Sequence, residues 1–245
     1  KLLLGYKKLL KKEAPDLVLT YSIKPNIYIG LLCRKTKIPY YANVQGLGTA
    51  FQKPVLTSLV TVLYRIAFQN VQRVFFENEE NAREFRERKI LSADRQVVLS
   101  GAGINLERYQ MAPYPNHKRM HFLYLGRIMK EKGMDELFYT VRRLKKENED
   151  FILDLVGFFE EEYKDQVEEL ENSGIAHFYG FQSDPRMFYI EADCVVLPSY
   201  HEGMSNVLLE AAATGRPVIT SNISGCRESV EDRKSGFLVE AKNKE

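Results

Sequence analysis

The chain has 245 residues and a mass of 28.4 kDa, enough for one large domain or two small ones. Its 35 basic and 33 acidic side chains leave a formal net charge of +2, which argues against a dedicated nucleic-acid binder with a strongly basic face. Apolar residues make up 44% of the chain, as in a packed core, and no apolar run approaches the roughly 20 residues that cross a bilayer. Cys33, Cys194 and Cys226 show neither disulfide-scaffold density nor metal-binding spacing, so we expect a reducing, cytoplasmic compartment.

The first twelve residues, Lys1–Lys12, predict an amphipathic helix with leucines on one side and lysines on the other. Such a helix can lie on an anionic membrane surface. An ordinary surface helix that covers a sheet is the alternative. We therefore keep a peripheral contact with the inner face of the plasma membrane as one possible partner interaction.

Apolar runs and helix-period stretches then alternate to the end of the chain. Continuous apolar runs such as Cys194–Pro198 are typical of strands that are covered on both faces of a parallel sheet. Helical patterns with one apolar face occupy Met134–Asn148 and Glu161–Asn172. The alternation predicts an α/β fold of the doubly wound type. The expected strands are Asp16–Thr20, Ile38–Asn43, Arg73–Glu77, Gln96–Ser100, His121–Gly126, Phe151–Val156, Ala176–Gly180, Cys194–Pro198, Pro217–Ser221 and Gly236–Glu240.

One stretch interrupts this alternation. Asn105–Lys118 contains Pro113 and Pro115 and has no clear period. We interpret residues 105–120 as a linker between a first α/β unit, 1–104, and a second, 121–245. Both units are expected to be truncated, because the first lacks the initial strand and glycine turn of a Rossmann-like half and the second has no closing helix. A naturally short protein is the alternative to a piece of a longer one.

The segment from Gly126 to Gly133 follows a predicted strand and precedes a predicted helix. Arg127 and Lys132 would therefore lie at the carboxyl end of the strand, where open α/β sheets bind ligands. An arginine fork and a lysine point charge that converge there could neutralise a diphosphate. The pattern is weak alone, since a solvated basic loop with Gly133 as a turn residue would look the same.

The most informative segment, Leu197–Gly215, is predicted to run from a strand end through a loop into a helix. The helix begins near Ser205 or Asn206, and its free N–H groups and positive dipole end favour an anion. Glu202 lies in the loop and Glu210 just over one turn inside the helix. A bound phosphate would sit between these two carboxylates, with Glu210 free to bind ribose hydroxyls. Alternatively, Ser205 is only an N-cap, Glu210 is solvated and Glu202 caps a turn.

Four motifs in order resemble the donor domain of group 1 glycosyltransferases, the retaining enzymes of GT-B fold. They are Gly126-Arg127 with Lys132-Gly133, Leu155-Val-Gly157, the run from Pro198 through Glu202 to Glu210, and Gly215-Arg-Pro-Val-Ile. In the first unit, residues 22–26 and 44–48 are similar to bacterial members that build polyprenyl-diphosphate-linked glycans, and residues 100–105 to the segment before the family's linker. The resemblance implies a GT-B-like fold of two Rossmann-like parallel-sheet units.

The resemblance also implies roles on the donor side. Arg127 and Lys132 would hold the donor's diphosphate, Glu202 would contact the transferred sugar as the catalytic residue, and Glu210 would bind the ribose. The backbone that approaches the phosphates and the sugar would come from Gly203, Met204, Ser205 and Asn206.

The base and acceptor sides receive roles in the same way. Gly157 and Phe181 would border the nucleobase pocket, although Phe181 could equally be a core residue. Gly46 and Gly48 would let an acceptor-side loop approach the substrate, although a simple turn is the alternative. Ser22 and Lys24 stand where many family members carry a histidine, and we assign Lys24 to the acceptor side.

The resemblance implies a retaining hexosyltransferase that moves a sugar from a UDP-sugar to a lipid-linked or polysaccharide acceptor, as in capsule or O-antigen synthesis. No Asp-x-Asp pair occurs, so we expect a metal-independent mechanism in which positive side chains and a helix start stabilise the leaving diphosphate. No cofactor and no nucleic acid are expected. A sugar-nucleotide epimerase of the same fold and an inactive nucleotide-binding fragment are the alternatives.

Overall fold

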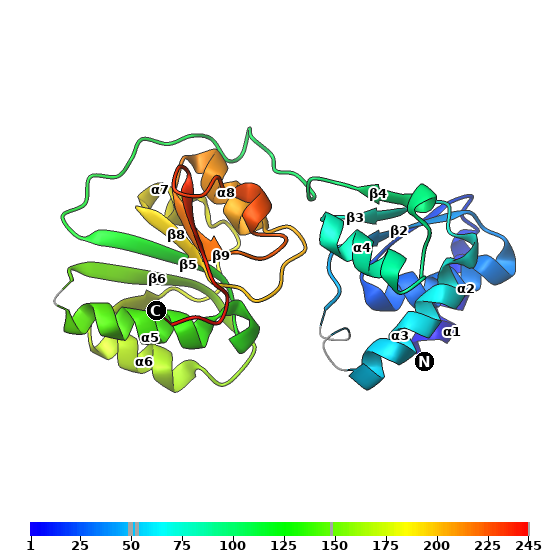
Figure 1. The fold of residues 1–245 in the computed structure, drawn as a ribbon, viewed down its shortest axis with the longest axis horizontal. Helices are drawn as coiled ribbons and strands as arrows, with labels where there is room; N and C mark the ends of the chain where they lie inside the picture. Colours follow the sequence, from blue (N-terminus) through cyan, green and yellow to red (C-terminus); the bar gives the residue numbers. More distant parts are fainter. Residues whose placement is uncertain (49–50, 52–53, 148, 245) are drawn as a thin grey trace. The chain divides into compact units, whose positions relative to one another are not determined.

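The structure is a computed structural model that describes residues 1–48, 51, 54–147 and 149–244 (Figure 1). The chain divides into two compact units, Lys1–Ala102 and Gly103–Glu245. Each unit has its own parallel sheet and its own apolar core. We call them unit 1 and unit 2 and describe each by itself.

Unit 1 is built on a four-stranded parallel sheet in the order β1-β2-β3-β4. Its strands are β1 (Val18–Tyr21), β2 (Tyr40–Val44), β3 (Val74–Phe76) and β4 (Gln96–Val98). Its helices are α1 (Leu2–Glu13), α2 (Ile23–Thr36), α3 (Pro54–Ala67) and α4 (Glu79–Glu87), with short 3-10 turns at Phe68–Asn70 and Ala93–Arg95.

The strand order of unit 1 follows the sequence without a reversal. Right-handed crossovers therefore place α2, α3 and α4 on the same face of the sheet (Figure 1). The core lies between these helices and the strands, where the rings of Tyr64, Phe68 and Phe85 contact one another. On the opposite face, Leu19 and Tyr21 of β1 remain half exposed.

Unit 2 is built on a six-stranded parallel sheet in the order β10-β9-β8-β5-β6-β7. Its strands are β5 (Met120–Ile128), β6 (Phe151–Phe159), β7 (Ala176–Phe178), β8 (Cys194–Leu197), β9 (Val218–Ser221) and β10 (Gly236–Val239). Its helices are α5 (Met134–Lys146), α6 (Lys164–Asn172), α7 (Arg186–Glu191) and α8 (Asn206–Thr214), with 3-10 turns at Lys130–Lys132 and Arg227–Ser229.

The strand order of unit 2 reverses once. From β5 the chain moves outward to β6 and β7, then returns to β8 on the other side of β5 and continues to β9 and β10. The reversal places α5 and α6 on one face of the sheet and α7 and α8 on the other (Figure 1). It also creates a topological switch point between the carboxyl ends of β5 and β8, where ligands bind in open α/β sheets.

The predicted fold class is confirmed. Each of the ten predicted strands overlaps an observed one, and all strand pairs are parallel. The helix predicted at Met134–Asn148 ends at Lys146, and Asn148 lies outside the described residues. The helix predicted from Glu161 begins at Lys164.

The predicted linker, residues 105–120, packs along unit 2. Arg216, which is 3% exposed, donates from its guanidinium to the carbonyl oxygen of Pro113 at 2.7 Å and to that of Ile190 at 2.9 Å. The Tyr114 ring lies under the same guanidinium, 5.3 Å from it. A buried cation is stable only when its donors are paired, and here backbone carbonyls pair them. This clamp, which we call the Arg216 clamp, fixes Pro113 and Tyr114 to α7.

Candidate active site

Three turns meet at the carboxyl edge of the sheet of unit 2. They are the β5–α5 turn at residues 129–133, the β8–α8 loop at residues 198–205 and the loop after β9 at residues 222–226. Tyr200 N donates to Glu131 O at 2.9 Å, and Ser205 N donates to Gly225 O at 2.9 Å. The β8–α8 loop is thus held on both sides by its neighbours.

Two glycines allow this close approach. At Gly133, with φ 76°, an added Cβ atom would lie 2.1 Å from Pro198 O. At Gly225, with φ 88°, it would lie 2.5 Å from Gly203 O. Only glycine tolerates both the left-handed backbone and these contacts, so the turns can pack backbone against backbone.

Lys132 and Glu202 form an ion pair across the switch point. Lys132 Nζ donates to Glu202 Oε1 at 2.5 Å, and the two side chains are only 16% and 14% exposed. Lys132 comes from the turn after β5 and Glu202 from the loop after β8, so the sheet topology brings together two residues 70 positions apart. The pair thus combines a cation and a carboxylate that are both largely shielded from water.

Arg127 lies at the end of β5, and its Nη1 donates to Glu160 Oε2 at 2.6 Å. The hydroxyl of Tyr124 donates to the backbone oxygen of Arg127 at 2.6 Å. Burial raises the pKa of Tyr124, the negative charge of Glu202 raises it further, and the positive charge of Arg127 opposes both. The charges of Arg127 and Glu202 thus both act on Tyr124, while the Arg127 guanidinium itself pairs with Glu160. Glu160 was not foreseen, because no local pattern links it to Arg127.

The start of α8 presents backbone donors at the same edge. Ser205 is the N-cap, and its Oγ accepts from Leu208 N at 3.4 Å. The first N–H groups of a helix have no partner inside the helix. The backbone N–H groups of Asn206 and Val207 are therefore oriented to donate to an anion. Gly203 and Met204 lie between this helix start and Glu202 and are partly exposed.

Glu210 lies one turn further along α8 and is held by tyrosines. Tyr189 of α7, fully buried, donates from its hydroxyl to Glu210 Oε2 at 2.7 Å. Burial raises the pKa of Tyr189 and raises that of Tyr109 to about 12, and the charge of Glu210 adds to both shifts. Glu210 is thus a partnered carboxylate rather than a freely solvated one. The two tyrosines were missed, since neither lies near Glu210 in the sequence.

Gly157 and Phe181 lie close together at the neighbouring strand ends. Gly157 pairs with Gly126 in the register of β5 and β6, and its N–H donates to Gly180 O at 2.9 Å. Phe181 is 70% exposed and packs edge to face on Phe158, with ring centroids 6.4 Å apart. Phe181 is therefore a surface residue and the alternative of a core residue is wrong. Phe158 was missed, although it directly follows Gly157.

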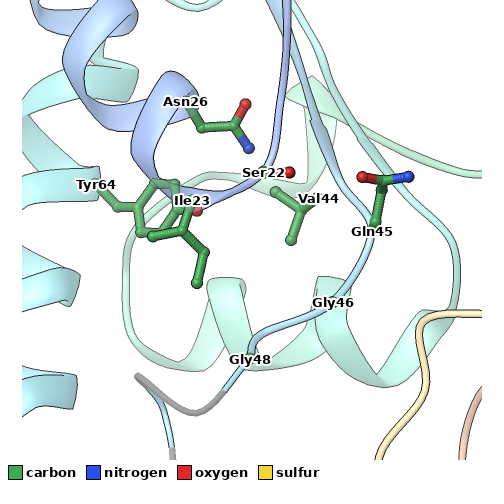
Figure 2. Close-up of a pocket in the computed structure, with 8 residues that line it drawn as sticks. All are labelled: Ser22, Ile23, Asn26, Val44, Gln45, Gly46, Gly48 and Tyr64. Carbon is green, nitrogen blue, oxygen red and sulfur yellow. The ribbon is translucent and has the colours of Figure 1, made fainter. Parts of the chain in front are cut away.

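The acceptor-side residues belong to unit 1. Gly46 and Gly48 line a cavity of about 260 Å³ together with six others: Ser22, Ile23, Asn26, Val44, Gln45 and Tyr64 (Figure 2). Lys24 directly follows the lining residue Ile23 in the first turn of α2, and its side chain is exposed. Figure 2 shows that the β2 end and the α2 start contribute opposite walls. Asn26 is fully buried in the wall and donates from Nδ2 to Asn43 O at 2.8 Å.

Within the residues that the structure describes, no group of three or more histidine, cysteine or carboxylate side chains could hold a metal ion. The rings of His117 and His121 lie 4.4 Å apart, and His121 Nδ1 contacts Asp154 Oδ2 at 2.9 Å. These groups lie at the amino end of β5, whereas Lys132 follows its carboxyl end. The expected absence of a metal and a cofactor stays a prediction.

Two family descriptions match the chain. That of the group 1 glycosyl transferases matches residues 108–245, and that of the glycosyl transferase 4-like domain matches residues 1–78. The first match contains every donor-side residue discussed above. The second contains Lys24, Gly46 and Gly48.

Similar proteins in bacteria are also glycosyltransferases. The chain is 30% identical to the N,N'-diacetylbacillosaminyl-diphospho-undecaprenol alpha-1,3-N-acetylgalactosaminyltransferase of Campylobacter jejuni, and the match covers 96% of the chain and 66% of that protein. It is 31% identical to the capsular polysaccharide biosynthesis glycosyltransferase CapM of Staphylococcus aureus over 58% of the chain and 40% of CapM. The chain thus spans two thirds or less of the length of these relatives.

Solved structures share the fold. Anabaena HepE in complex with UDP-glucose matches with a TM-score of 0.80 at 18% identity, over 98% of the chain and 69% of HepE. Sucrose-phosphate synthase from Thermosynechococcus elongatus matches with a TM-score of 0.82 at 19% identity, over 99% of the chain and 65% of that protein. With the two family matches and the Campylobacter relative, they support one conclusion: the chain belongs to the group 1 glycosyltransferases and has their GT-B-like fold.

Proposed function

We propose that the protein is a retaining, metal-independent hexosyltransferase that moves a sugar from a UDP-sugar to a lipid-linked or polysaccharide acceptor. The observation that carries this proposal is the Lys132–Glu202 ion pair at the switch point, beside the start of α8. The names of the relatives support the substrates: the Campylobacter protein acts on an undecaprenol-diphospho-linked sugar, and HepE was solved with UDP and UDP-glucose.

The ion pair supplies a cation and a carboxylate for the two ends of the donor. In the proposed complex, Lys132 exchanges Glu202 for a diphosphate oxygen, and the released Glu202 carboxylate accepts hydrogen bonds from hydroxyls of the transferred sugar. Arg127 and the N–H groups of Met204 and Asn206 would add positive potential at the same edge, whereas the N–H of Ser205 already donates to Gly225 O. These groups are most useful when charge develops on the leaving diphosphate, which is the step that they would accelerate.

The remaining donor groups lie around this centre. Glu210, oriented by Tyr189, would accept hydrogen bonds from the ribose hydroxyls. Phe181 and its edge-to-face neighbour Phe158 would offer an aromatic wall to the uracil ring, and Gly157 would let the ring approach the backbone. On the acceptor side, we assign Lys24, Gly46 and Gly48 to the wall that receives the nucleophilic hydroxyl.

Retention follows if the acceptor attacks from the face on which UDP departs. The bond between the anomeric carbon and the diphosphate breaks, the acceptor oxygen bonds to that carbon, and the acceptor proton passes to the departing phosphate oxygen. Glu202 then binds the sugar without a covalent bond to it. A cytoplasmic UDP-sugar and a lipid-linked acceptor would bring the protein to the inner face of the plasma membrane.

The test measures UDP binding and UDP release in parallel. We expect Lys132→Ala and Glu202→Ala to weaken UDP-sugar turnover about 10²–10³-fold. Lys130→Ala is the matched control, because Lys130 lies in the same turn but is 67% exposed. Unchanged turnover in the first two variants would refute the site. Conversion of the donor sugar without any acceptor would indicate an epimerase, and UDP binding without conversion in the presence of acceptors would indicate a binding protein.

A further inference from the structure

A buried hydrogen bond joins α5 to the β8–α8 loop through two residues that have no role in the proposed donor site. The hydroxyl of Tyr200 donates to Glu136 Oε2 at 2.6 Å, and each residue is 9% exposed. Glu136 lies in the first turn of α5, where the free N–H groups and the dipole of the helix favour a carboxylate. Burial and the carboxylates of Glu136 and Asp135 raise the pKa of Tyr200, so its hydroxyl stays protonated and keeps donating.

Tyr200 is one of two anchors of the loop segment that carries Glu202. At one end of the segment, Tyr200 N donates to Glu131 O at 2.9 Å, and at the other end Ser205 N donates to Gly225 O at 2.9 Å. A backbone hydrogen bond alone leaves the segment free to turn about that bond. The hydroxyl of Tyr200, held by α5, adds a second fixed point and so determines the direction in which the chain continues towards Glu202.

Helix α5 and the turn before it also carry Lys132. Lys132 lies between Glu131, whose carbonyl oxygen accepts from Tyr200 N, and the first turn of α5 with Glu136. The stem of Lys132 is flexible, so its ion pair with Glu202 does not by itself fix where that carboxylate lies. The hydrogen bond between Tyr200 and Glu136 joins the loop to the helix that follows Lys132, and it thus sets Glu202 against a rigid element.

We propose that Glu136 and Tyr200 form a positioning pair that directs Glu202 towards the transferred sugar. The pair touches no substrate and acts through the β8–α8 loop. The inference rests on the proposed function, in which Glu202 binds the sugar and Lys132 binds the diphosphate. Loss of the hydrogen bond should therefore impair turnover of a UDP-sugar, because a small misplacement of a contact group is costly in the transition state. Binding of UDP, which has no sugar for Glu202 to contact, should be spared.

Turnover and UDP affinity of the full chain are measured in parallel, as UDP release from UDP-glucose and UDP-N-acetylgalactosamine and as titration with UDP. We expect Tyr200→Phe and Glu136→Leu to lower kcat about 10–10²-fold. Their UDP affinity should change less than about twofold. Glu136→Gln keeps an oxygen that accepts from the Tyr200 hydroxyl, so it should retain most of the turnover that Glu136→Leu loses.

Tyr163→Phe is the matched control. The Tyr163 hydroxyl donates to Asp135 Oδ1 at 2.8 Å, also in the first turn of α5, and Tyr163 is 6% exposed. Tyr163 directly precedes α6 and does not belong to the β8–α8 loop. Both tyrosine variants remove a buried hydroxyl that donates to a carboxylate, so they should lower the stability of unit 2 to a similar extent. Only Tyr200→Phe should lower turnover.

Hydrogen exchange tests the positioning pair without any activity. In Tyr200→Phe, peptides that cover residues 198–205 should exchange faster than in the unchanged chain, and in Tyr163→Phe they should not. An unchanged chain that releases no UDP from either donor would refute the proposed function. Faster exchange of the loop in Tyr200→Phe would then still support the link between α5 and the loop.

Four results would overturn the positioning pair. The first is loop exchange in Tyr200→Phe that is no faster than in Tyr163→Phe, and the second is an equal loss of turnover in these two variants. The third is a Glu136→Gln variant that is no more active than Glu136→Leu. The fourth is a parallel loss of UDP affinity and turnover in Tyr200→Phe, because this would indicate general disruption of the sheet edge rather than misplacement of Glu202.

Discussion

The two units use the same strand–helix repeat, yet only one of them contains a reversal of strand order among its described strands. In unit 2 the reversal between β5 and β8 places helices on both faces of the sheet and opens a switch point at its carboxyl edge. In unit 1 the order β1-β2-β3-β4 places the helices that follow β1, β2 and β3 on one face. The comparison teaches that topology brings Lys132 and Glu202 together, because they follow the two strands at the reversal, and the donor site that we propose lies there.

The largest expected loss of stability comes from a substitution that breaks the close packing at that edge. Gly133→Ala combines a left-handed backbone with a Cβ atom 2.1 Å from Pro198 O, so we expect unit 2 to lose about 3 kcal/mol or more of stability. Gly174→Ala is the control, because its φ is also left-handed, 66°, but no atom lies within 4 Å of the added Cβ, and it should cost about 1–2 kcal/mol. Hydrogen exchange of peptides from residues 103–245 measures both. Equal losses would contradict the close approach of the two turns.

A smaller effect concerns the support of Glu210. Tyr189→Phe removes the hydroxyl that donates to Glu210 Oε2, and we expect unit 2 to lose about 1–3 kcal/mol. UDP affinity should fall with it if Glu210 binds the ribose. Tyr139→Phe, which removes a hydroxyl from a half-exposed ring of α5, should leave both stability and affinity unchanged. A stability loss without any change in UDP affinity would limit Tyr189 to a structural role.

Alkaline pH should destabilise unit 2 through the partly buried phenol of Tyr109, which neighbours Glu210. Burial and the charge of Glu210 raise the pKa of Tyr109 to about 12, above the value near 10 of an unfolded tyrosine. The folded state thus holds the proton more tightly, so this stabilisation is complete below about pH 10 and is lost as the pH rises towards 12. Phenolate absorbance and hydrogen exchange together measure the loss. Tyr109→Phe should reduce the pH dependence; an unchanged curve would exclude Tyr109 as its source.

The smallest expected difference is in how fast the thiols of the two units are alkylated. Burial raises the pKa of Cys33 to about 11 and those of Cys194 and Cys226 to about 12, so none should react readily in the native protein. At intermediate denaturant, Cys33 of α2 should be alkylated first. The sheet of unit 1 has its helices on one face only, and Leu19 and Tyr21 of β1 are half exposed on the other, so we expect unit 1 to unfold before unit 2. Mass spectrometry after pulsed alkylation gives the order. Earlier labelling of Cys194 would reverse the comparison.

Local patterns predicted the parts of the site that depend on one turn of chain. The predicted helix start was confirmed at Ser205, because an N-cap and a following apolar face are properties of adjacent residues. Gly215, the last residue of the segment that was predicted to run into this helix, is its C-cap, with φ 79°. The sheet class followed from the continuous apolar runs, since these require cover on both faces.

The partners of the site could not be predicted from such patterns. Glu160 beside Arg127, Tyr189 beside Glu210 and Phe158 beside Phe181 come from different strand ends, and only the register of the sheet brings them together. The charge pattern did not identify the partner of Arg127 either. Glu160 belongs to a run of three glutamates, and any of them could have paired with Arg127.

The Arg216 clamp bears on how the two halves can be dissected. Burial lowers the pKa of its guanidinium, which nevertheless stays charged, and the carbonyl oxygen of Pro113 belongs to the stretch that composition alone would discard as a tether. A recombinant fragment that starts at residue 121 would lose the Pro113 acceptor and the Tyr114 ring and keep the acceptors of α7, Tyr189 O and Ile190 O, whereas one that starts at residue 103 would keep all of them. A fragment that contains unit 2 should therefore begin before Pro113, where the hydrogen-bond acceptors of Arg216 are retained, rather than at the first strand, β5.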